Sequence, residues 1–497
     1  MVRLSPSSTM KRFLIGLLGA LALAAPAAAA PDLTKMTAGE LAAFMKAFPK
    51  GGELHNHLSG AIYGETLLNW AAEDGLCVDM KALAIRPACA GDDFKPAKEV
   101  IADEALRSLV VDSVSTRHPW FRDRSGHDQF FSSFGRMGMK PSREGDALAV
   151  VMGDLARQNT FYLELMVTPQ FFPSRSLGRD VGWKGDPAAT RAALSEAGLE
   201  KLVPTVIANT DAMQARAREV LKCGTPEARP GCQVTVRFLF QAIRQGTPVE
   251  TMAQLQLGVA TVAADRRWVG LQLVAPEDSQ DAVTHYDAHM KIVDLLTDHG
   301  RKTPVALHAG ELTLDVATPE TLSYHIAAAV RVAGARRIGH GVDLPHETGA
   351  EALAAEMAAK GVLVEVNPIS NRQILGVKPE DHPYAWLRQR RVPVAISTDD
   401  AGILRSDLSG DYALAVKTGA TYDDLKTAAR NGIAYGFLAG EGLWSDPNAY
   451  RKPVAACAGQ LGNAEPKGAC ADLVAKSDKA REQWRHERLL REFEAGF

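Results

Sequence analysis

Eight short apolar segments recur along the chain, and longer helix-like stretches separate them. The segments span residues 53–58, 161–167, 234–240, 268–274, 305–310, 336–340, 362–367 and 392–397. Strands that are apolar on both faces are typical of a parallel sheet whose two sides are covered. The alternation predicts an α/β fold, and the count of eight strands favours a closed (β/α)8 TIM-type barrel. A doubly wound open sheet is the alternative.

Three regions fall outside this alternation. Residues 31–50 are expected to form a short N-terminal helix. Residues 72–150 form an insertion after the first strand, and residues 440–497 form a C-terminal helical appendage with a strongly charged final segment. Because a single barrel can absorb more than about 250 residues, residues 31–497 are predicted to be one domain.

Residues 1–30 have the pattern of a cleavable secretory signal peptide. Lys11 and Arg12 precede the apolar run 13–25, and small residues follow that run before Pro31. A membrane anchor is the alternative, but the run is shorter than the roughly 20 residues that a helical membrane span needs. We therefore expect a secreted or periplasmic protein with no stable membrane span after cleavage.

The six cysteines fall into three pairs of near neighbours, and long stretches of chain separate one pair from the next. Local pairing needs only short loops to close, which favours it over the many other pairings. The predicted disulfides are Cys77–Cys89, Cys223–Cys232 and Cys457–Cys470. Such bonds indicate an oxidising compartment. Six free or buried thiols are the alternative, and a metal cluster is disfavoured because no Cys-x-x-Cys spacing occurs.

The charge of the chain argues against a nucleic-acid partner. Its formal net charge is −3, whereas a nucleic acid would call for clustered lysines and arginines. A small molecule is the expected partner. The sequence gives no indication of the oligomeric state.

Ionisable side chains occur where several of the predicted strands end. His55 and His57 end the first strand at positions i and i+2, so both imidazoles face the same side. His308 lies at the end of the fifth strand, and Asp399 follows the eighth. In a barrel, these strand ends form the rim where active sites are built. Three imidazoles and a carboxylate suit one Zn²⁺ ion with a position left for water, although a His-x-His pair alone would be a weak signal.

Three further ionisable residues lie at the same predicted rim. Glu311 follows His308 closely enough to reach a substrate, and His340 lies between two glycines that permit close approach of a ligand. Asp400 either points at substrate or caps the following helix. Zinc lowers the pKa of water to about 7, so a site of this composition predicts hydrolysis at neutral pH.

A series of motifs runs in order through residues 50 to 440. The motifs are ELHNHLSGAI (53–62), YLELMVTP (162–169), HAGE (308–311), RIGHGVDL (337–344), EVNPISNRQ (365–373), STDDAGI (397–403) and ARNGIAYGFL (429–438). This series closely resembles the adenosine deaminases, which belong to the metal-dependent amidohydrolase superfamily. The export signal, the paired cysteines and the insertion resemble the secreted, growth-factor-related branch more than the compact cytosolic enzymes.

The resemblance implies a zinc-dependent hydrolase that converts adenosine, or a related 6-aminopurine nucleoside, to the 6-oxo product plus ammonia. The ligands of one zinc ion would be His55, His57, His308 and Asp399. Glu311 would protonate the ring nitrogen next to the attacked carbon, which requires a raised pKa in a water-poor site. His340 would orient and deprotonate the attacking water, and Asp400 would hydrogen-bond the imidazole part of the purine.

Two positions depart from the family pattern in ways that concern the substrate. The family usually has an aspartate that contacts the ribose hydroxyl, and Ser59 takes that place here. After the fourth strand the family commonly has a glycine whose backbone amide lies near a ring nitrogen, and Ala275 takes that place. Adenine or a modified aminopurine is therefore an alternative substrate to intact adenosine.

Other side chains are candidates for the pocket wall. Ser370 and Asn371, after the seventh strand, are placed to line it. Aromatic residues of the insertion could cover the pocket, although packing within the insertion is the role that we expect for them. These aromatic residues are Trp120, Phe130, Phe131 and Phe134.

Two other classes of protein compete with a deaminase. Other amidohydrolases often hold two metals bridged by a modified lysine on the fourth strand, but residues 268–274 contain no lysine. A non-catalytic binding or signalling protein on the same barrel would be expected to lose a ligand or the acid, and all of them are present. Site chemistry rather than fold decides between these classes.

Overall fold

The computed structural model describes residues 30–117 and 123–496. The predicted signal peptide therefore lies outside the described residues, apart from Ala30, and Trp120 lies outside them as well. No helix in the described ranges is both long enough and apolar enough to cross a membrane.

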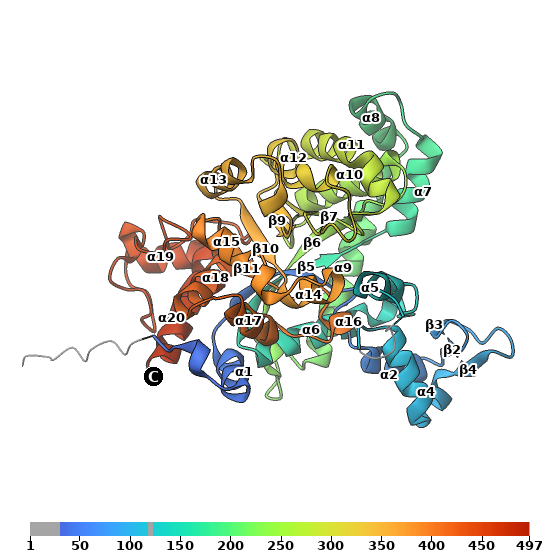
Figure 1. Ribbon diagram of the computed structural model, residues 1–497, viewed down its shortest axis with the longest axis horizontal. Coiled ribbons are helices and arrows are strands. Elements are labelled where there is room, and N and C mark those ends of the chain that lie inside the picture. Colours follow the sequence, from blue (N-terminus) through green and yellow to red (C-terminus); the bar gives the residue numbers. More distant parts are fainter. Residues whose placement is uncertain (1–29, 118–122, 497) are drawn as a thin grey trace, which may run out of the picture.

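Within the described residues, eight parallel strands form one sheet at the centre of the molecule (Figure 1). They are β1 (Gly51–His57), β5 (Thr160–Val167), β6 (Thr235–Ile243), β7 (Trp268–Val274), β8 (Val305–Ala309), β9 (Arg337–His340), β10 (Leu363–Val366) and β11 (Val394–Ile396). Each strand pairs with the next one along the chain in the order β1-β5-β6-β7-β8-β9-β10-β11. The predicted barrel is confirmed, and each of these strands overlaps one of the expected segments.

The barrel closes between its first and last strands through a single bridge. Asn56 and Asp399 form an isolated parallel β-bridge. The amide of Asp399 donates to the carbonyl of His55 at 2.9 Å, and the amide of His57 donates to the carbonyl of Asp399 at 3.3 Å. The seam between β1 and β11 therefore consists of the segments that carry the predicted metal ligands.

Helices cover the outside of the barrel, as its buried strands require. From the N-terminus they are α1 (Ala38–Ala47), α6 (Glu144–Arg157), α7 (Phe171–Val181), α8 (Pro187–Glu196), α9 (Val203–Val220), α10 (Pro248–Ala264), α11 (Gln280–Thr297), α12 (His325–Arg331), α13 (Ala350–Lys360), α14 (Pro368–Leu375), α15 (Tyr384–Gln389), α16 (Ala401–Leu404), α17 (Leu408–Lys417) and α18 (Tyr422–Ala434). Local signals set their ends. Thr247 and Glu250 form a capping box at the start of α10, and Gly361 ends α13 in the left-handed conformation that glycine favours.

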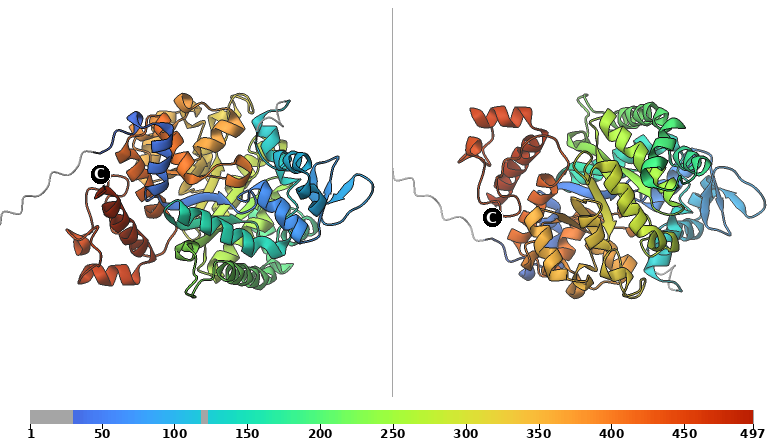
Figure 2. Two further views of the ribbon diagram at one scale, coloured as in Figure 1. Left: turned by 90° about the horizontal axis from the view of Figure 1, so that it is seen from below. Right: turned by 90° about the horizontal axis from the view of Figure 1, so that it is seen from above.

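The insertion after β1 projects from one side of the barrel (Figures 1 and 2). It contains α2 (Gly64–Glu73), a three-stranded antiparallel sheet, and the helices α3 (Ala97–Ala102), α4 (Glu104–Ser113) and α5 (Gly126–Phe134). The sheet has the order β3 (Ala84–Arg86), β2 (Cys77–Asp79), β4 (Phe94–Pro96). The insertion was predicted over residues 72–150. In the structure, the last part of that range already belongs to α6, which begins at Glu144 and leads into β5.

The C-terminal region after α18 forms a separate small core beside the barrel. It contains α19 (Ala469–Lys476) and α20 (Asp478–Glu494), and Leu443 and Trp484 are buried with the cysteines of this region. All six cysteines lie in described residues and form the predicted disulfides, namely Cys77–Cys89, Cys223–Cys232 and Cys457–Cys470. The local pairing is confirmed.

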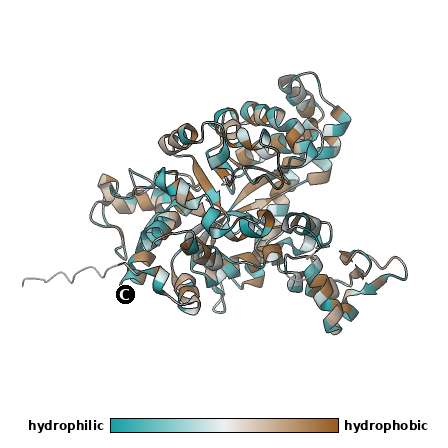
Figure 3. Ribbon diagram, viewed as in Figure 1, coloured by the Kyte–Doolittle hydropathy of each residue, from teal (hydrophilic) through white to brown (hydrophobic). Residues whose placement is uncertain are grey.

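The main core fills the space inside the strands and between the strands and helices. All residues of β1 are buried, as are those of β8, β9, β10 and β11. Hydrophobic residues are concentrated on these central strands (Figure 3). Because both faces of the sheet are covered, the few ionisable residues on the strands must find partners inside the protein.

Candidate metal centre and active site

The predicted rim residues converge at the carboxyl ends of the strands. His55 and His57 end β1, His308 lies in β8, His340 ends β9, and Asp399 follows β11. All five side chains are buried. The i and i+2 spacing places the two histidines of β1 on the same side of the strand, as the sequence predicted.

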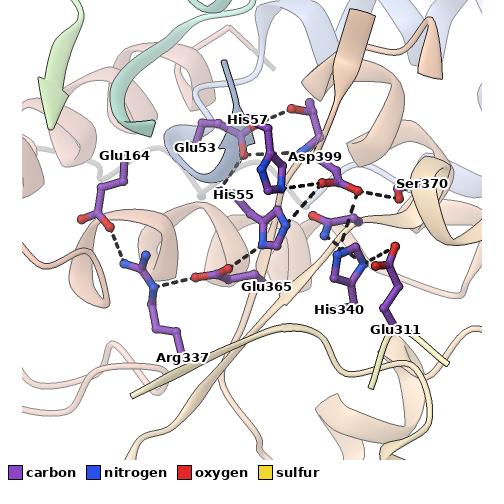
Figure 4. Close-up of polar contacts among 12 residues, drawn as sticks. Glu53, His55, His57, Glu164, Glu311, Arg337, His340, Glu365, Ser370 and Asp399 are labelled. Atoms are coloured by element: carbon purple, nitrogen blue, oxygen red, sulfur yellow. Dashed lines mark hydrogen bonds and ion pairs between the residues drawn. The ribbon is translucent and has the colours of Figure 1, made fainter. Parts of the chain in front are cut away.

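The carboxylate of Asp399 lies at the centre of this group (Figure 4). Its Oδ1 atom is 3.1 Å from His57 Nε2 and 3.4 Å from His55 Nε2. Burial would raise the pKa of Asp399, but its contacts with His55 and His57 outweigh burial and hold the pKa well below its usual range. The ring centroid of His308 lies 4.5 Å from that of His55 and 5.1 Å from that of His57.

Possible ligand atoms fall into two overlapping groups in the described residues. The first comprises His55, His308, His340 and Asp399, and the second comprises His57, Asp399 and Asp400, with the atoms of each group within 4.8 Å of one another. The buried Nε2 of His55 and Nδ1 of His308 have no hydrogen-bond partner. Unpartnered buried nitrogens facing a carboxylate are what a site for a divalent metal requires, so the residues present fit a metal ion.

A surrounding set of side chains holds these residues in place. Glu365 Oε2 lies 2.7 Å from His55 Nδ1, and Gln241 Oε1 lies 2.8 Å from His57 Nδ1. Ser370 donates to Asp399 Oδ2 at 2.8 Å. These contacts leave Nε2 of each β1 histidine facing the centre of the site, because the other ring nitrogen is engaged. Glu365 and Gln241 were not among the site residues predicted from the sequence, although an acidic residue inside an otherwise apolar strand is a signal for Glu365.

Glu365 belongs to a buried ionic chain below the site. Arg337 donates through Nε to Glu365 at 2.6 Å and through Nη1 to Glu164 at 2.6 Å, and all three side chains are almost completely buried. Figure 4 shows this chain running from Glu164 to His55. A buried arginine between two carboxylates is satisfied electrostatically, and it also fixes the orientation of Glu365.

Backbone conformation at the site is unusual for residues with side chains. His340 has φ of 69°, Asp399 has φ of 67° and Ala275 has φ of 92°. Residues other than glycine seldom adopt these values, and such strain is concentrated at functional sites. Gly60 is required for a different reason, because a Cβ at that position would lie 1.7 Å from Oδ1 of Asp400.

Glu311 and His340 form a second functional pair beside the ligand group. Oε1 of Glu311 lies 3.5 Å from Nδ1 of His340. Burial, assisted by the nearby carboxylates of Asp399 and Glu277, raises the pKa of Glu311 well above its usual range. Burial also lowers the pKa of His340 to about 3, so its imidazole is neutral at pH 7. The arrangement provides one buried carboxyl that holds a proton and one buried imidazole that can accept a proton.

A cavity of about 580 Å³ opens above these groups. Three of the predicted substrate contacts, Ser59, Ala275 and Asp400, line it. Asp400 precedes α16 but its side chain makes no capping hydrogen bond, so the alternative role as a helix cap is not observed. Burial, together with the neighbouring Asp399, raises the pKa of Asp400 well above its usual range.

The aromatic residues of the insertion correct one expectation. Phe130, Phe131 and Phe134 do not only pack within the insertion but line the cavity, because α5 lies against α14 beside the barrel mouth. Phe171 forms a further part of the wall. Of the described residues that line the cavity, none is a lysine or an arginine.

Ser370 and Asn371 were expected on the pocket wall, and the structure places both behind it. Both are completely buried and neither lines the cavity. The amide of Asn371 lies 3.1 Å from Nδ1 of His340, and its carbonyl oxygen lies 3.1 Å from Nε2 of His382. Ser370 and Asn371 therefore orient Asp399 and His340 from behind.

Comparisons with known proteins indicate the family of this chain. A family model described as adenosine deaminase matches residues 146–442. The chain is 27% identical over 288 residues to the adenine deaminase of Rhizobium rhizogenes, which covers 57% of this chain and 72% of that protein. It is 31% identical over 125 residues to the adenosine deaminase of Plasmodium vivax, which covers 25% of this chain and 32% of that protein.

Two solved structures share the fold. The adenine deaminase from Arthrobacter aurescens matches with a TM-score of 0.52 and 17% identity, over 79% of this chain and 94% of that one. The N6-mAMP deaminase of Arabidopsis matches with a TM-score of 0.51 and 20% identity, over 80% and 95% respectively. The matched family model covers more than half of the chain and includes the strand ends that carry Glu311, His340 and Asp399, and the protein therefore belongs to the adenosine deaminase family.

Proposed function

We propose that this protein is an exported, zinc-dependent deaminase that hydrolyses the exocyclic amino group of an aminopurine nucleoside or a closely related aminopurine. In this reaction the oxygen of water bonds to the amino-bearing ring carbon, the carbon–nitrogen bond breaks, and the products are the 6-oxo purine and ammonia. The observation that carries the proposal is the buried convergence of His55, His57, His308 and Asp399 beneath a cavity that Glu311 also lines.

His55, His57, His308 and Asp399 would hold the zinc ion. Two of these residues, His55 and His57, direct Nε2 toward the same Oδ1 atom of Asp399. His340 is the weaker candidate ligand, because its Nε2 atom is 4.0 Å from the other oxygen of Asp399. A zinc ion with these ligands would supply a Lewis acid that makes water acidic enough to react at neutral pH.

The remaining charged residues divide the proton transfers between them. Glu311, whose raised pKa keeps it protonated, would donate its proton to the ring nitrogen next to the attacked carbon. His340, whose lowered pKa keeps it neutral, would take the proton of the attacking water. Asp400 lines the cavity with an unpartnered Oδ1 atom, which suits a hydrogen bond to the purine.

The cavity wall favours an uncharged substrate. No lysine or arginine among the described lining residues is available to bind a phosphate group, whereas phenylalanines are present. Ser59 offers only a hydroxyl at the position where the family usually places an aspartate for the ribose. We therefore expect adenosine, deoxyadenosine or adenine to be deaminated in preference to adenylate.

Export is part of the proposal. The pattern of residues 1–30 suits a signal peptide, and the three disulfides in the described chain are stable where the surroundings are oxidising. The same disulfides and the insertion after β1 support an assignment to the secreted, growth-factor-related branch of the family.

The test is a substrate panel with the purified protein and one equivalent of zinc. Adenosine, deoxyadenosine, adenine and adenylate are each mixed with the enzyme while ultraviolet absorbance and released ammonia are recorded. Turnover of at least one uncharged compound, with adenylate slower, is the expected result. A protein that is folded and zinc-loaded but releases no ammonia from any of the four would refute the proposal.

A further inference from the structure

A buried carboxylate outside the proposed catalytic set makes three hydrogen bonds next to Glu311. Glu277 lies in the loop after β7 and is only 1% exposed. Its Oε1 atom accepts from the backbone amide of Gly310 at 3.2 Å, and its Oε2 atom accepts from the backbone amide of Glu311 at 3.0 Å. Its third partner is Nδ1 of His325, which lies 2.6 Å from Oε1.

Among the described residues, Glu277 is the only hydrogen-bond partner of these two amides. Strand β8 ends at Ala309, and residues 310–313 belong to no helix or strand. Buried backbone N–H groups that lack secondary-structure partners must be satisfied by side chains or water. Glu277 supplies both acceptors, because each of its two carboxylate oxygens accepts from one of these consecutive amides.

Glu277 is itself held rigidly. His325 begins α12 and stacks on the ring of Tyr286, with centroids 3.6 Å apart and planes inclined by 1°. The hydroxyl of Tyr286 also donates to the backbone carbonyl of His325 at 2.9 Å. Because Nδ1 of His325 faces a carboxylate, this nitrogen carries the proton. The carboxylate of Glu277 is therefore anchored on a helix rather than on another loop.

The opposite side of the loop is fastened as well. Arg244 is completely buried and donates to the carbonyl of Ala275 at 2.9 Å and to the carbonyl of His308 at 3.2 Å. Gly310 adopts φ of 75°, and a Cβ there would lie 2.3 Å from Oδ1 of Asp343. The backbone at 308–311 is thus held by two buried charged side chains, Arg244 and Glu277.

We infer that Glu277 is a positioning residue of the deaminase, whose carboxylate fixes the Gly310–Glu311 backbone and thereby directs the Glu311 side chain at the substrate. The inference rests on the function proposed above. An acid that must reach one ring nitrogen depends on supports of this kind, because an error of about 1 Å in placement can cost about 100-fold in rate.

The test compares Glu277→Gln with a matched control, Asp446→Asn. A glutamine can accept at one position but presents an NH2 group at the other, where it would face a backbone donor. Asp446 makes equivalent bonds, since its carboxylate accepts from the consecutive amides of Arg451 and Lys452, and it lies in the C-terminal region beside the barrel.

Hydrogen exchange and kinetics are measured for both variants. In Glu277→Gln the amides of Gly310 and Glu311 should exchange faster, kcat should fall by about 100-fold, and KM and bound zinc should change little. In Asp446→Asn these two amides and kcat should match the wild type. If Glu277→Gln does not fold, Glu277→Asp keeps the charge but is one methylene too short for both amides, and should give the same pattern more weakly.

Unchanged exchange at Gly310 and Glu311 in the Glu277 variants would overturn the inference. So would an equal loss of kcat in Asp446→Asn, which would indicate a general structural effect. If the wild type deaminates none of the panel, the proposed function fails, but the exchange measurement still decides whether Glu277 fixes the loop.

Discussion

Glu365 and His55 are joined by a buried hydrogen bond, with Oε2 of Glu365 lying 2.7 Å from Nδ1 of His55 and both side chains inaccessible to solvent. Arg337 holds the other oxygen of Glu365 at 2.6 Å. The orientation of a proposed metal ligand is therefore fixed by a strand-borne carboxylate, which is in turn fixed by a strand-borne arginine. Contacts of this kind usually set both the tautomer and the basicity of a ligand histidine.

Glu365→Gln is expected to weaken zinc binding by about 10- to 100-fold, because the amide cannot stabilise the proton on Nδ1 of His55 as a carboxylate does. Titration of the folded variant with zinc against a competing chelator measures the effect. Glu164→Gln is the control, since it removes the other partner of Arg337 but leaves the bond between Glu365 and His55 in place. Equal zinc affinity in Glu365→Gln and the wild type would contradict this prediction.

Glu311→Gln is expected to keep zinc and lose about 100- to 10,000-fold in kcat, because the amide cannot donate the proton that a raised pKa keeps on the acid. Steady-state kinetics and metal analysis of the same preparation provide the test. Glu320→Gln changes an exposed glutamate further along the same connection and should behave as the wild type does. A variant of Glu311 with full activity would remove this residue from its proposed role.

Lys50 is expected to make stability depend on pH. It is completely buried, with Nζ donating to the carbonyls of Phe48 and Gln158, and burial lowers its pKa from 10.5 to about 7. At pH values between these two pKa values, the unfolded chain binds a proton at Lys50 that the folded chain does not. The free energy of unfolding therefore rises with pH. Below about pH 7 both states are protonated and this contribution is flat.

Relative to Lys50→Met, the wild type should therefore gain up to about 1.4 kcal/mol in unfolding free energy for each pH unit above 7. Urea unfolding from pH 6 to pH 9 measures the difference. Lys46→Met, at an exposed lysine of α1, serves as control and should give a curve parallel to the wild type. A constant difference between Lys50→Met and the wild type over this range would show that the lysine does not titrate there.

The Cys457–Cys470 disulfide is expected to stabilise the C-terminal region, where both sulfur-bearing residues are buried with Leu443 and Trp484. The bond closes a loop of 13 residues in sequence separation, and loops of this size contribute about 3 kcal/mol by restricting the unfolded chain. Replacing both cysteines by serine should lower the melting temperature, and reductant should then have less effect than on the wild type. A melting temperature equal to that of the wild type would argue against this contribution.

The sequence allowed the barrel and the rim residues to be predicted because both depend on local patterns. A run such as 362–367 is apolar enough to indicate a buried strand, and the end of a strand in a barrel defines where its last side chain lies. Residues whose role depends on distant parts of the chain were missed. Glu277 and His325 meet because the loop after β7 reaches the start of α12, and no spacing along the chain reports that contact.

Buried charges within strands carried information that could have been used. Glu164 and Glu365 each interrupt an otherwise apolar segment, and Arg337 begins a short buried strand. A charge in a strand covered on both faces needs a partner of opposite sign. The position of α5 could not be inferred in this way. Its phenylalanines would suit either an internal core or a pocket wall. The packing of α5 against α14 and α16, with Gly126 against the carbonyl of Gln373, places the helix at the barrel mouth.

The single bridge between Asn56 and Asp399 has a consequence for the whole molecule. An ion held jointly by His55, His57 and Asp399 would link β1 to the segment that follows β11. This is where the sheet has the fewest hydrogen bonds between neighbouring strands. Because such an ion binds only the closed form, its affinity adds to the free energy of closure. Removal of the ion by a chelator would then open the barrel first between β1 and β11. Loss of enzymatic activity and susceptibility to proteases would therefore arise together.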